Sequence, residues 1–287
     1  MIFSEKPIPS VEVGAYYDEL DPFYLDSWGD QLHHGLWEKG NETTDEAIAH
    51  LRETIAEGTG ATGGHRVCDI GCGYGTAALY WAETRQWETV GVTVSSKQQE
   101  TAHNRAQALT KGIPRPEFLL CDWLDNDFRD ESFDAATSIE CLSHIADKEG
   151  FFREVERTLK PGRQLSLSAW ISGKKTSTRR AKFLLEPICA GGQFPSLVGS
   201  GEIRSLAESA GLVVEELREV GPLVKKTWRI ILWRLLTRLL TRREYRRFLG
   251  KDARNGWLRT LTVLRVWIAF ELGVLDYALL RAKKRAS

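Results

Sequence analysis

Short apolar runs alternate with longer amphipathic segments between residues 65 and 220 of this chain. The apolar runs predict six strands, at His65–Ile70, Thr89–Val94, Glu117–Leu120, Phe133–Ile139, Gln164–Ala169 and Val213–Val220. The segments between them predict helices near residues 76–84, 96–111, 147–159 and 201–210. Strands that alternate with helices form a parallel sheet covered on both faces, so the pattern favours a doubly wound α/β fold.

The flanking segments follow other patterns. Thr43 and Glu46 form a capping box, which predicts a helix to about Ala56, and the glycine-rich residues 58–64 predict a linker. Residues 222–275 are rich in Trp, Leu and Arg and are expected to be helical, whereas Asp276–Lys283 is expected to be a closing strand. We therefore expect three parts: an N-terminal lid with helices (1–57), a core (58–221 and 276–287) and an Arg-rich helical cap insert (222–275).

Composition narrows the class of protein. The chain has 287 residues, of which 42% are hydrophobic and 27% charged, as in a globular protein with a sizeable core. The formal net charge is zero, but residues 221–287 contain 17 Lys and Arg against four Asp and Glu, which favours an anionic partner for that part. The N-terminus lacks the apolar region of a signal peptide, no apolar run reaches the roughly 20 residues that span a bilayer, and the five cysteines form no CxxC pair. A cytoplasmic location is expected.

Three glycines at alternate positions follow the first predicted strand. Asp69 lies inside the strand, Gly71, Gly73 and Gly75 form the turn, and a helix is expected from Thr76. A strand, a glycine turn and a helix N-terminus together present backbone N–H groups to a ligand. The spacing differs from the GxGxxG pattern of dinucleotide sites. The acid before the glycines also suits a positively charged ligand group better than a phosphate.

This Asp-x-Gly-x-Gly-x-Gly pattern resembles motif I of the class I S-adenosylmethionine-dependent methyltransferases. The resemblance implies that the glycine loop holds the methionine end of the cofactor, with Asp69 near its ammonium group. It also implies a Rossmann-like, mostly parallel seven-stranded sheet with an antiparallel last strand. Lys160-Pro161-Gly162-Arg163 is similar to the family's Lys-Pro-Gly-Gly turn before the fifth strand.

The second strand points to one branch of that family. Its end reads Gly-Val-Thr-Val-Ser-Ser-Lys-Gln, with Thr93 where most class I members carry an acid for the ribose. This pattern resembles the branch that includes γ-tocopherol, sterol and phosphoethanolamine methyltransferases and cyclopropane fatty-acid synthases. By that resemblance, Thr93, Ser95 and Gln98 supply neutral hydrogen bonds to the ribose or to nearby cofactor atoms.

The resemblance extends to two further segments. After the third strand, Asp122 is implied to meet the exocyclic amine of adenine while Trp123 flanks the ring, and both contacts are physically reasonable. The N-terminal aromatics are similar to the entry segment of tocopherol-type enzymes, which covers the cofactor. Four of them are assigned on this basis, Trp28 to the cofactor and Tyr16, Tyr17 and Trp37 to a lid or pocket wall.

Candidates for catalysis follow the fourth strand. His144 is the natural general base, because the unperturbed pKa of histidine lies near neutrality and the strand end faces the ligand crevice. A positioning or helix-start role for His144 is the alternative. Glu140 is a candidate to contact the cofactor or to orient the acceptor. No metal is expected, because neither carboxylate nor cysteine stands at metal-like spacing from His33 and His34.

The cap insert contains a helical pattern with Arg234, Arg238 and Arg242 at intervals of four residues, after Trp228, a candidate for the substrate pocket. Three interpretations remain open. The helix of residues 228–247 could lie on an anionic membrane surface. It could instead wall a greasy acceptor pocket, with the arginines binding a diphosphate or carboxylate. It could also be a solvated cationic helix.

These patterns lead to one favoured function and two alternatives. The favoured function is transfer of a methyl group from S-adenosylmethionine, which leaves as S-adenosylhomocysteine, to an O, N or C atom of a small or lipid-like hydrophobic acceptor. The first alternative is C-methylation of an alkene, such as a sterol or prenyl diphosphate, through a carbocation. The second is a non-catalytic, cofactor-binding scaffold at membranes. No nucleic-acid partner is expected, because no stacking platform is evident.

Overall fold

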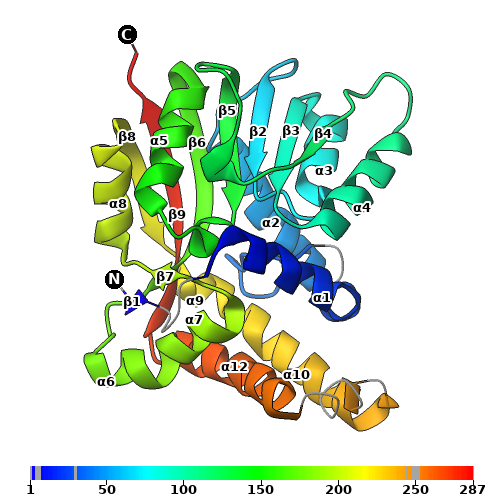
Figure 1. Cartoon of the computed structure of the whole chain (residues 1–287), viewed down its shortest axis with the longest axis vertical. Coiled ribbons are helices and arrows are strands. Elements are labelled where there is room, and N and C mark those ends of the chain that lie inside the picture. The colour runs from blue at the N-terminus through cyan, green and yellow to red at the C-terminus, as the bar shows by residue number, and fades with distance from the viewer. Residues whose placement is uncertain (1, 4–7, 29–30, 244, 247–252, 287) are drawn as a thin grey trace.

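Seven strands form one central sheet in the computed structural model (Figure 1). The structure describes residues 2–3, 8–28, 31–243, 245–246 and 253–286; the side chains of residues 3, 20–28 and 253–260 lie outside this description. The strands of the sheet are β2 (Arg66–Ile70), β3 (Glu88–Thr93), β4 (Glu117–Leu120), β5 (Phe133–Ile139), β6 (Leu159–Ser172), β8 (Leu212–Glu219) and β9 (Leu275–Lys284).

The sheet order is β4-β3-β2-β5-β6-β9-β8. The pairs from β4 to β6 are all parallel, and β9 is antiparallel to both of its neighbours, β6 and β8. The expected mostly parallel sheet with an antiparallel last strand is confirmed. The chain order reverses at β2, which lies between β3 and β5, and a ligand crevice is expected at this switch point.

Alternate residues of the central strands face two separate cores, as the two-residue period of a strand requires. Val67 and Ala135 pack in the core that includes α2 (Thr44–Glu57) and α3 (Thr76–Arg85). Their neighbours Cys68 and Ala136 pack in the other core, with α5 (Lys148–Thr158) and α8 (Ser200–Ser209). The helix α4 (Ser96–Gln107) packs beside β4. Both faces of the sheet are therefore covered.

The remaining helices gather at the carboxyl-end edge of the parallel strands (Figure 1). The lid helix α1 (Ser10–Trp28) crosses this edge, and α10 (Lys226–Thr241) and α12 (Ala253–Glu271) pack against each other beyond it. Shorter elements complete the chain: β1 (Ile2–Phe3), η1 (Trp123–Asp125), η2 (Leu142–His144), α6 (Thr178–Arg180), the π-helical turn η3 (Ala181–Leu185), α7 (Glu186–Gly192), β7 (Ser196–Leu197) and α9 (Gly221–Val224). The division into lid, core and cap stays a prediction.

Two features differ from the sequence analysis. The expected turn at Lys160-Pro161-Gly162 lies inside β6, because the strand already pairs with β5 at Leu159 and resumes at Gln164 after a register shift. Gly162 has a φ of +73° and absorbs this irregularity. The helical segment between Thr178 and Gly192 was not predicted, and it contributes to the roof of the site described below.

Candidate active site

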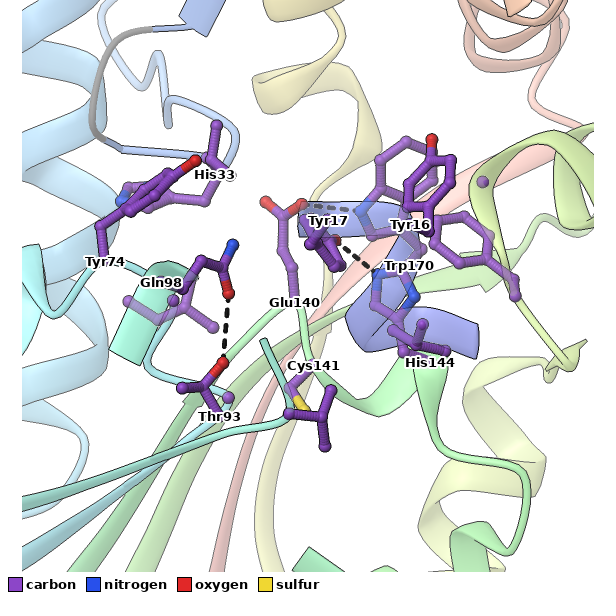
Figure 2. Close-up of a pocket in the computed structure, with 18 of the residues that line it drawn as sticks. Tyr16, Tyr17, His33, Tyr74, Thr93, Gln98, Glu140, Cys141, His144 and Trp170 are labelled. Atoms are coloured by element: carbon purple, nitrogen blue, oxygen red, sulfur yellow. Dashed lines mark hydrogen bonds between the residues drawn. The ribbon is translucent and has the colours of Figure 1, made fainter. Parts of the chain in front are cut away.

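The carboxyl ends of β2, β3, β4 and β5 open into a cavity of about 360 Å³. Its floor is the switch point of the sheet, and its far wall comes from α1, α7, α10 and α12. Figure 2 shows Thr93, Gln98 and Tyr74 on one side of this cavity and Tyr16, Trp170 and His144 on the other. We call these sides the cofactor half and the acceptor half.

The glycine turn after β2 lines the cofactor half with backbone atoms, because Gly71 and Gly73 carry no side chain. Gly71 and Gly73 have φ values of +78° and +54°, in the left-handed region that favours glycine. A Cβ at Gly73 would meet nothing within 4 Å, so the chain there is open to a ligand. Gly75 does not line the cavity, contrary to expectation. A Cβ there would lie 2.5 Å from the ring of Phe118, so Gly75 serves close packing.

Asp69 provides the strongest test of whether the residues fit S-adenosylmethionine. Its Oδ1 atom accepts a hydrogen bond from Thr137 Oγ1 at 3.1 Å, whereas Oδ2 is buried with no partner among the described residues. Burial raises the pKa of Asp69 to about 7, partly offset by the bond from Thr137. A buried carboxylate oxygen without a donor is costly and calls for a cationic or N–H-bearing ligand group. The ammonium group of an amino-acid moiety meets this requirement.

Thr93 and Gln98 form the next part of the cofactor half. Thr93 Oγ1 donates to Gln98 Oε1 at 3.1 Å, and Figure 2 shows the Gln98 amide nitrogen turned away from Thr93. Both residues line the cavity. Ser95, expected beside them, does not. It is fully buried, and its hydroxyl caps α4 by accepting from the backbone N–H of Gln98. The position of Ser95 therefore does not support the expected direct contact between its side chain and the cofactor.

Asp122 and Trp123 follow β4 and also border the cavity. Asp122 Oδ1 caps the short helix η1 by accepting from the backbone N–H of Leu124 at 2.9 Å. The Trp123 indole is only 2% exposed, packs against Phe128 and Phe151, and donates from Nε1 to the Phe151 carbonyl. The ring is thus held mainly by the core, and the carboxylate of Asp122 is the better placed of the two for a ligand.

Glu140 is the centre of a buried hydrogen-bond network that the sequence analysis missed. Its Oε1 accepts from the backbone N–H and the Nδ1 of His34, at 2.7 and 2.8 Å, and from the Tyr277 hydroxyl at 2.9 Å. Its Oε2 accepts from Trp170 Nε1 at 2.7 Å. His34 Nε2 in turn accepts from Trp228 Nε1 at 2.6 Å. Because an indole N–H can only donate, Nε2 of His34 is the acceptor in this bond, and Nδ1 is the atom that donates to Glu140.

This network explains the unusual backbone and charge of Glu140. The residue has a φ of +63°, a costly conformation for a residue with a side chain. Burial alone would raise the pKa of Glu140, but its contacts with His34 lower that pKa, so the carboxylate stays ionised. Both oxygens are occupied by donors from the protein. Glu140 therefore ties together the segment before α2, β6 and β9 rather than offering a free oxygen to a ligand.

His144 lies at the cavity wall between Gln193 and Tyr17. Its Nδ1 lies 3.0 Å from the Gln193 carbonyl oxygen and must therefore carry the proton. Its Nε2 lies 2.9 Å from the hydroxyl of Tyr17 on α1 and accepts a hydrogen bond from it (Figure 2). Burial lowers the pKa of His144 to about 4, so the ring is neutral at pH 7. Tyr17 and His144 thus form a hydrogen-bonded pair at the cavity wall.

The acceptor half is lined mainly by apolar side chains. Its members on the cap are Trp228, Ile231, Leu235 and Leu239 of α10 and Val263 and Val266 of α12, spaced so that each helix presents one face. Trp170 and Phe194 pack edge to face beside them. Of the described residues that line the cavity, none is Lys or Arg. This arrangement fits the expectation that the cap forms one wall of a hydrophobic pocket. Trp228, a candidate for the substrate pocket, lies in that wall.

Other expected residues lie elsewhere. Arg234 and Arg238 are half-buried on a flank of α10 and do not line the cavity, so the structure does not support diphosphate binding by them. Trp37 is also outside the cavity, so its assignment to the pocket wall has no support from this structure. The sequence placed it with the lid aromatics, but its indole is buried against Gly35 and donates to the Glu42 carbonyl. The side chain of Trp28, the last residue of α1, lies outside the described residues.

Tyr16 lines the acceptor half, where its hydroxyl donates to the Gly191 carbonyl on α7 at 3.1 Å. Within the described part of the chain, no cluster of three or more His, Cys, Asp or Glu side chains is arranged to hold a metal ion. The described helices include none that is long and apolar enough to cross a membrane.

A Rossmann-like sheet with a glycine turn, a buried acid before it and a lid over the switch point defines a class I S-adenosylmethionine-dependent methyltransferase. Comparison with known proteins agrees. The chain belongs to the mycolic acid cyclopropane synthetase family, whose sequence profile matches residues 6–259. It is an enzyme that uses S-adenosylmethionine as methyl donor.

The relatives of this chain differ in the reactions that their names give. The chain is 29% identical over 228 residues to 27-O-demethylrifamycin SV methyltransferase of Amycolatopsis mediterranei, covering 78% of this chain and 81% of the relative. It is 31% identical over 254 residues to 24-methylenesterol C-methyltransferase 2 of Oryza sativa subsp. japonica, covering 83% and 68%. The solved structure of the cyclopropane synthase MmaA2 from Mycobacterium tuberculosis shares the fold, with a TM-score of 0.82 at 20% identity over 96% of this chain and 99% of that one.

Proposed function

We propose that this enzyme methylates a hydroxyl oxygen on a small or lipid-like, uncharged hydrophobic acceptor. The observation that carries the proposal is the Tyr17–His144 pair at an otherwise apolar acceptor half. A base at this place is useful for a hydroxyl acceptor, which must lose its proton. The apolar walls favour an acceptor that is bound mostly by the hydrophobic effect.

Six residues are proposed to hold the cofactor: Asp69, Gly71, Gly73, Thr93, Gln98 and Asp122. Asp69 would meet the ammonium group with its unpartnered Oδ2, and the glycine turn would lie along the amino-acid moiety. Thr93 and Gln98 would face the ribose hydroxyls, and Asp122 the adenine amine. When bound, S-adenosylmethionine supplies a methyl group on a positively charged sulfur and leaves as a neutral thioether. The protein's main contribution is then to align the acceptor oxygen and exclude water.

Proton transfer is assigned to the Tyr17–His144 pair. An acceptor hydroxyl beside Tyr17 would pass its proton to the Tyr17 oxygen while Tyr17 passes its own to Nε2 of His144, whose Nδ1 keeps its proton and its hydrogen bond to the Gln193 carbonyl. The low pKa of His144, about 4, does not prevent this, because an oxygen that is being methylated becomes far more acidic than an imidazolium. Burial keeps the ring neutral and ready to accept a proton at pH 7.

The carbocation alternative has less support from this geometry. It needs aromatic faces, which the acceptor half supplies, together with a carboxylate that is free to meet the positive charge. Glu140 is the acid of the acceptor half, and both of its oxygens already accept hydrogen bonds from the protein. Because no described cationic side chain lines the cavity, a prenyl diphosphate is also a poor match.

A methyl-transfer screen tests the proposal. Phenols, alicyclic alcohols, sterols, hydroxyl-free alkenes and prenyl diphosphates would be incubated with the enzyme and S-adenosylmethionine, and products identified by mass spectrometry and NMR. We expect methyl ethers from uncharged hydroxyl compounds and no product from the same compounds with the hydroxyl blocked as an acetate. C-methylated products from hydroxyl-free alkenes, or a preference for diphosphates, would overturn it.

We also propose that the cap contacts anionic membranes, from which a lipid-like acceptor could be drawn. On α10, Trp233 and Leu240 are 71% and 81% exposed, on the side opposite the cavity-lining residues, and Arg229 lies on the same side. Apolar side chains among cations, with no acid between residues 226 and 243, suit an anionic lipid surface. Co-sedimentation with phosphatidylglycerol vesicles should be lost in Trp233→Ala/Leu240→Ala and weakened by salt. Equal binding by this variant would reject the contact.

A further inference from the structure

Three consecutive residues attach the lid helix α1 to three different walls of the cavity. The Tyr16 hydroxyl donates to Gly191 on α7, and the Tyr17 hydroxyl contacts His144 on η2. Asp18 reaches the third wall, the turn between β3 and α4. The first two residues line the cavity, whereas Asp18 does not. Its contacts therefore call for a separate explanation.

Asp18 binds the start of α4 through four hydrogen bonds. Its Oδ1 accepts from the hydroxyl of Ser95 at 2.5 Å and from the backbone N–H of Lys97 at 3.2 Å. Its Oδ2 accepts from the Ser96 hydroxyl at 2.8 Å, and its backbone oxygen accepts from Lys97 Nζ at 2.6 Å. A carboxylate at a helix N-terminus is stabilised by the free N–H groups and the helix dipole. This contact joins the lid to a different secondary-structure element with charge-assisted bonds.

A second observation on α1 points to the same turn. Gly14 lies one helical turn before Asp18, and a Cβ built on it would lie 2.3 Å from the carbonyl oxygen of Val94. That oxygen is backbone and cannot move aside as the end of a long side chain could. The lid helix therefore approaches the end of β3 as closely as its backbone allows. Gly14 and Asp18 form one docking face, beside the face on which Ser10, Val13 and Tyr17 line the cavity.

The docking face connects directly to the cofactor half. Ser95, which donates to Asp18, accepts the backbone N–H of Gln98. Gln98 lines the cavity and accepts from Thr93. A movement of α1 away from Asp18's partners would release the Ser95 hydroxyl and remove Tyr17 from His144, because residues 17 and 18 are adjacent in one helix.

We propose that Asp18 and Gly14 are positioning residues that seat the lid helix on the β3–α4 turn, and so couple closure over the cofactor to the placement of Tyr17. Neither residue touches the cavity. Asp18 acts through Ser95 on the ribose side and through its neighbour Tyr17 on the acceptor side. The proposal has two parts. The first part is that Asp18 helps to retain the cofactor, and it does not depend on the acceptor. The second part is that Asp18 places Tyr17, and it rests on the proposed role of Tyr17.

Calorimetry with S-adenosylhomocysteine tests the first part without any acceptor. We expect Asp18→Ala to weaken binding about tenfold and to speed dissociation, and Asp18→Asn, which keeps one acceptor oxygen, to lie between it and the wild type. Glu12→Gln is the matched control, since it removes an exposed acid from the same helix and should bind normally. Wild-type affinity and dissociation rate in Asp18→Ala would overturn the proposal.

Gly14→Ala separates docking from simple loss of structure. Alanine favours the helix itself, so helical content should not fall, while binding of S-adenosylhomocysteine should weaken at least as much as in Asp18→Ala. Limited proteolysis should cut α1 faster in both variants when ligand is present. Unchanged affinity with Gly14→Ala would contradict a seated lid.

The second part is tested by combining Asp18→Ala with Tyr17→Phe once an acceptor is known. If Asp18 acts by placing Tyr17, the double variant should turn over at about the rate of Tyr17→Phe alone. Multiplicative losses in kcat would reject that coupling and leave the cofactor-retention result unaffected. Absence of any turnover in the wild type would instead speak against the proposed acceptor class, which the calorimetry does not use.

Discussion

The hydroxyl of Tyr17 lies 2.9 Å from Nε2 of His144, although the two residues are 127 positions apart in the chain. One belongs to the lid and the other to the turn after β5. The pair exists only when α1 lies across the strand ends. In the proposed mechanism proton transfer therefore depends on the position of the lid, which makes both residues sensitive tests of that mechanism.

Replacement of His144 by Ala should reduce kcat by about 10²–10³-fold with an unchanged dissociation constant for S-adenosylmethionine, because the base is lost and the cofactor half is untouched. Tyr17→Phe should cause a smaller loss. Steady-state kinetics and calorimetry would measure the two effects. Tyr80→Phe, which removes a hydroxyl outside the cavity, should behave as wild type. A full rate in His144→Ala would exclude the base role.

Cofactor affinity should depend on pH through Asp69. The pKa of this carboxyl is raised to about 7 by burial, so in the free protein it is increasingly protonated below pH 7 and loses the charge that would meet an ammonium group. Binding of S-adenosylmethionine should weaken as pH falls from 8 to 6 in the wild type. Asp69→Asn should bind poorly and show no such slope, whereas the exposed Asp127→Asn should keep it. A flat wild-type profile would argue against contact with Asp69.

The same substitution should stabilise the free protein at alkaline pH. A pKa that is higher in the folded than in the unfolded state means that stability is greatest below the unfolded value and is lost as pH rises through the folded one. A rise of about three units corresponds to at most about 4 kcal/mol. Chemical denaturation at pH 8 should therefore show Asp69→Asn to be more stable than the wild type. Reduced stability at that pH would contradict the buried, unpartnered carboxylate.

Glu140→Ala should destabilise the fold by about 3–5 kcal/mol, since it leaves the donors of His34 and Trp170 buried without an acceptor and leaves the Tyr277 hydroxyl with Ser168 alone. The pKa of Glu140 is lowered to about 2, so its stabilising effect is fully present above the unfolded value near 4.5 and is lost progressively as pH falls from there through the folded value. Urea denaturation at pH 7 and pH 3.5 should show the gap between variant and wild type narrowing in acid. The exposed Glu88→Gln provides the surface comparison, and an equal cost there would discount the network.

Leu235→Ala should raise the KM for a hydrophobic acceptor by about 10–30-fold with little change in kcat, because uniform apolar contact is removed from the acceptor half. Leu236→Ala is the adjacent control, since Leu236 is 44% exposed and does not line the cavity. Initial-rate measurements without lipid would compare them. Equal KM values for the two variants would place the acceptor elsewhere.

The cofactor half was largely predictable from the sequence because its residues lie in short, ordered segments. A strand followed by glycines has few other structural uses, and Asp69, Gly73 and Asp122 each lie close to the carboxyl end of a strand. Two of the predicted residues do not line the cavity and have a local packing role. Ser95 caps a helix, and Gly75 gives room to Phe118.

The acceptor half was harder to predict from the sequence, because its contacts join residues that are far apart in the chain. Glu140 meets His34, Trp170 and Tyr277, which come from three separate parts of the chain, and no local pattern relates them. The helices from Thr178 to Gly192 carry a π-helical turn that breaks the usual helical period. Trp37 looked like its aromatic neighbours, and only the packing against Gly35 distinguishes it.

The position of β9 has a consequence for biosynthesis. β6 and β8 do not pair with each other, and β9, which follows the cap helices in the chain, fills the space between them. Until β9 has been synthesised, the edges of β6 and β8 that pair with it stay unpaired, and Tyr277 is not yet present to donate to Glu140. We expect the acceptor wall to form only when β9 inserts, so that a chain stalled within the cap would hold an incomplete sheet and no working site.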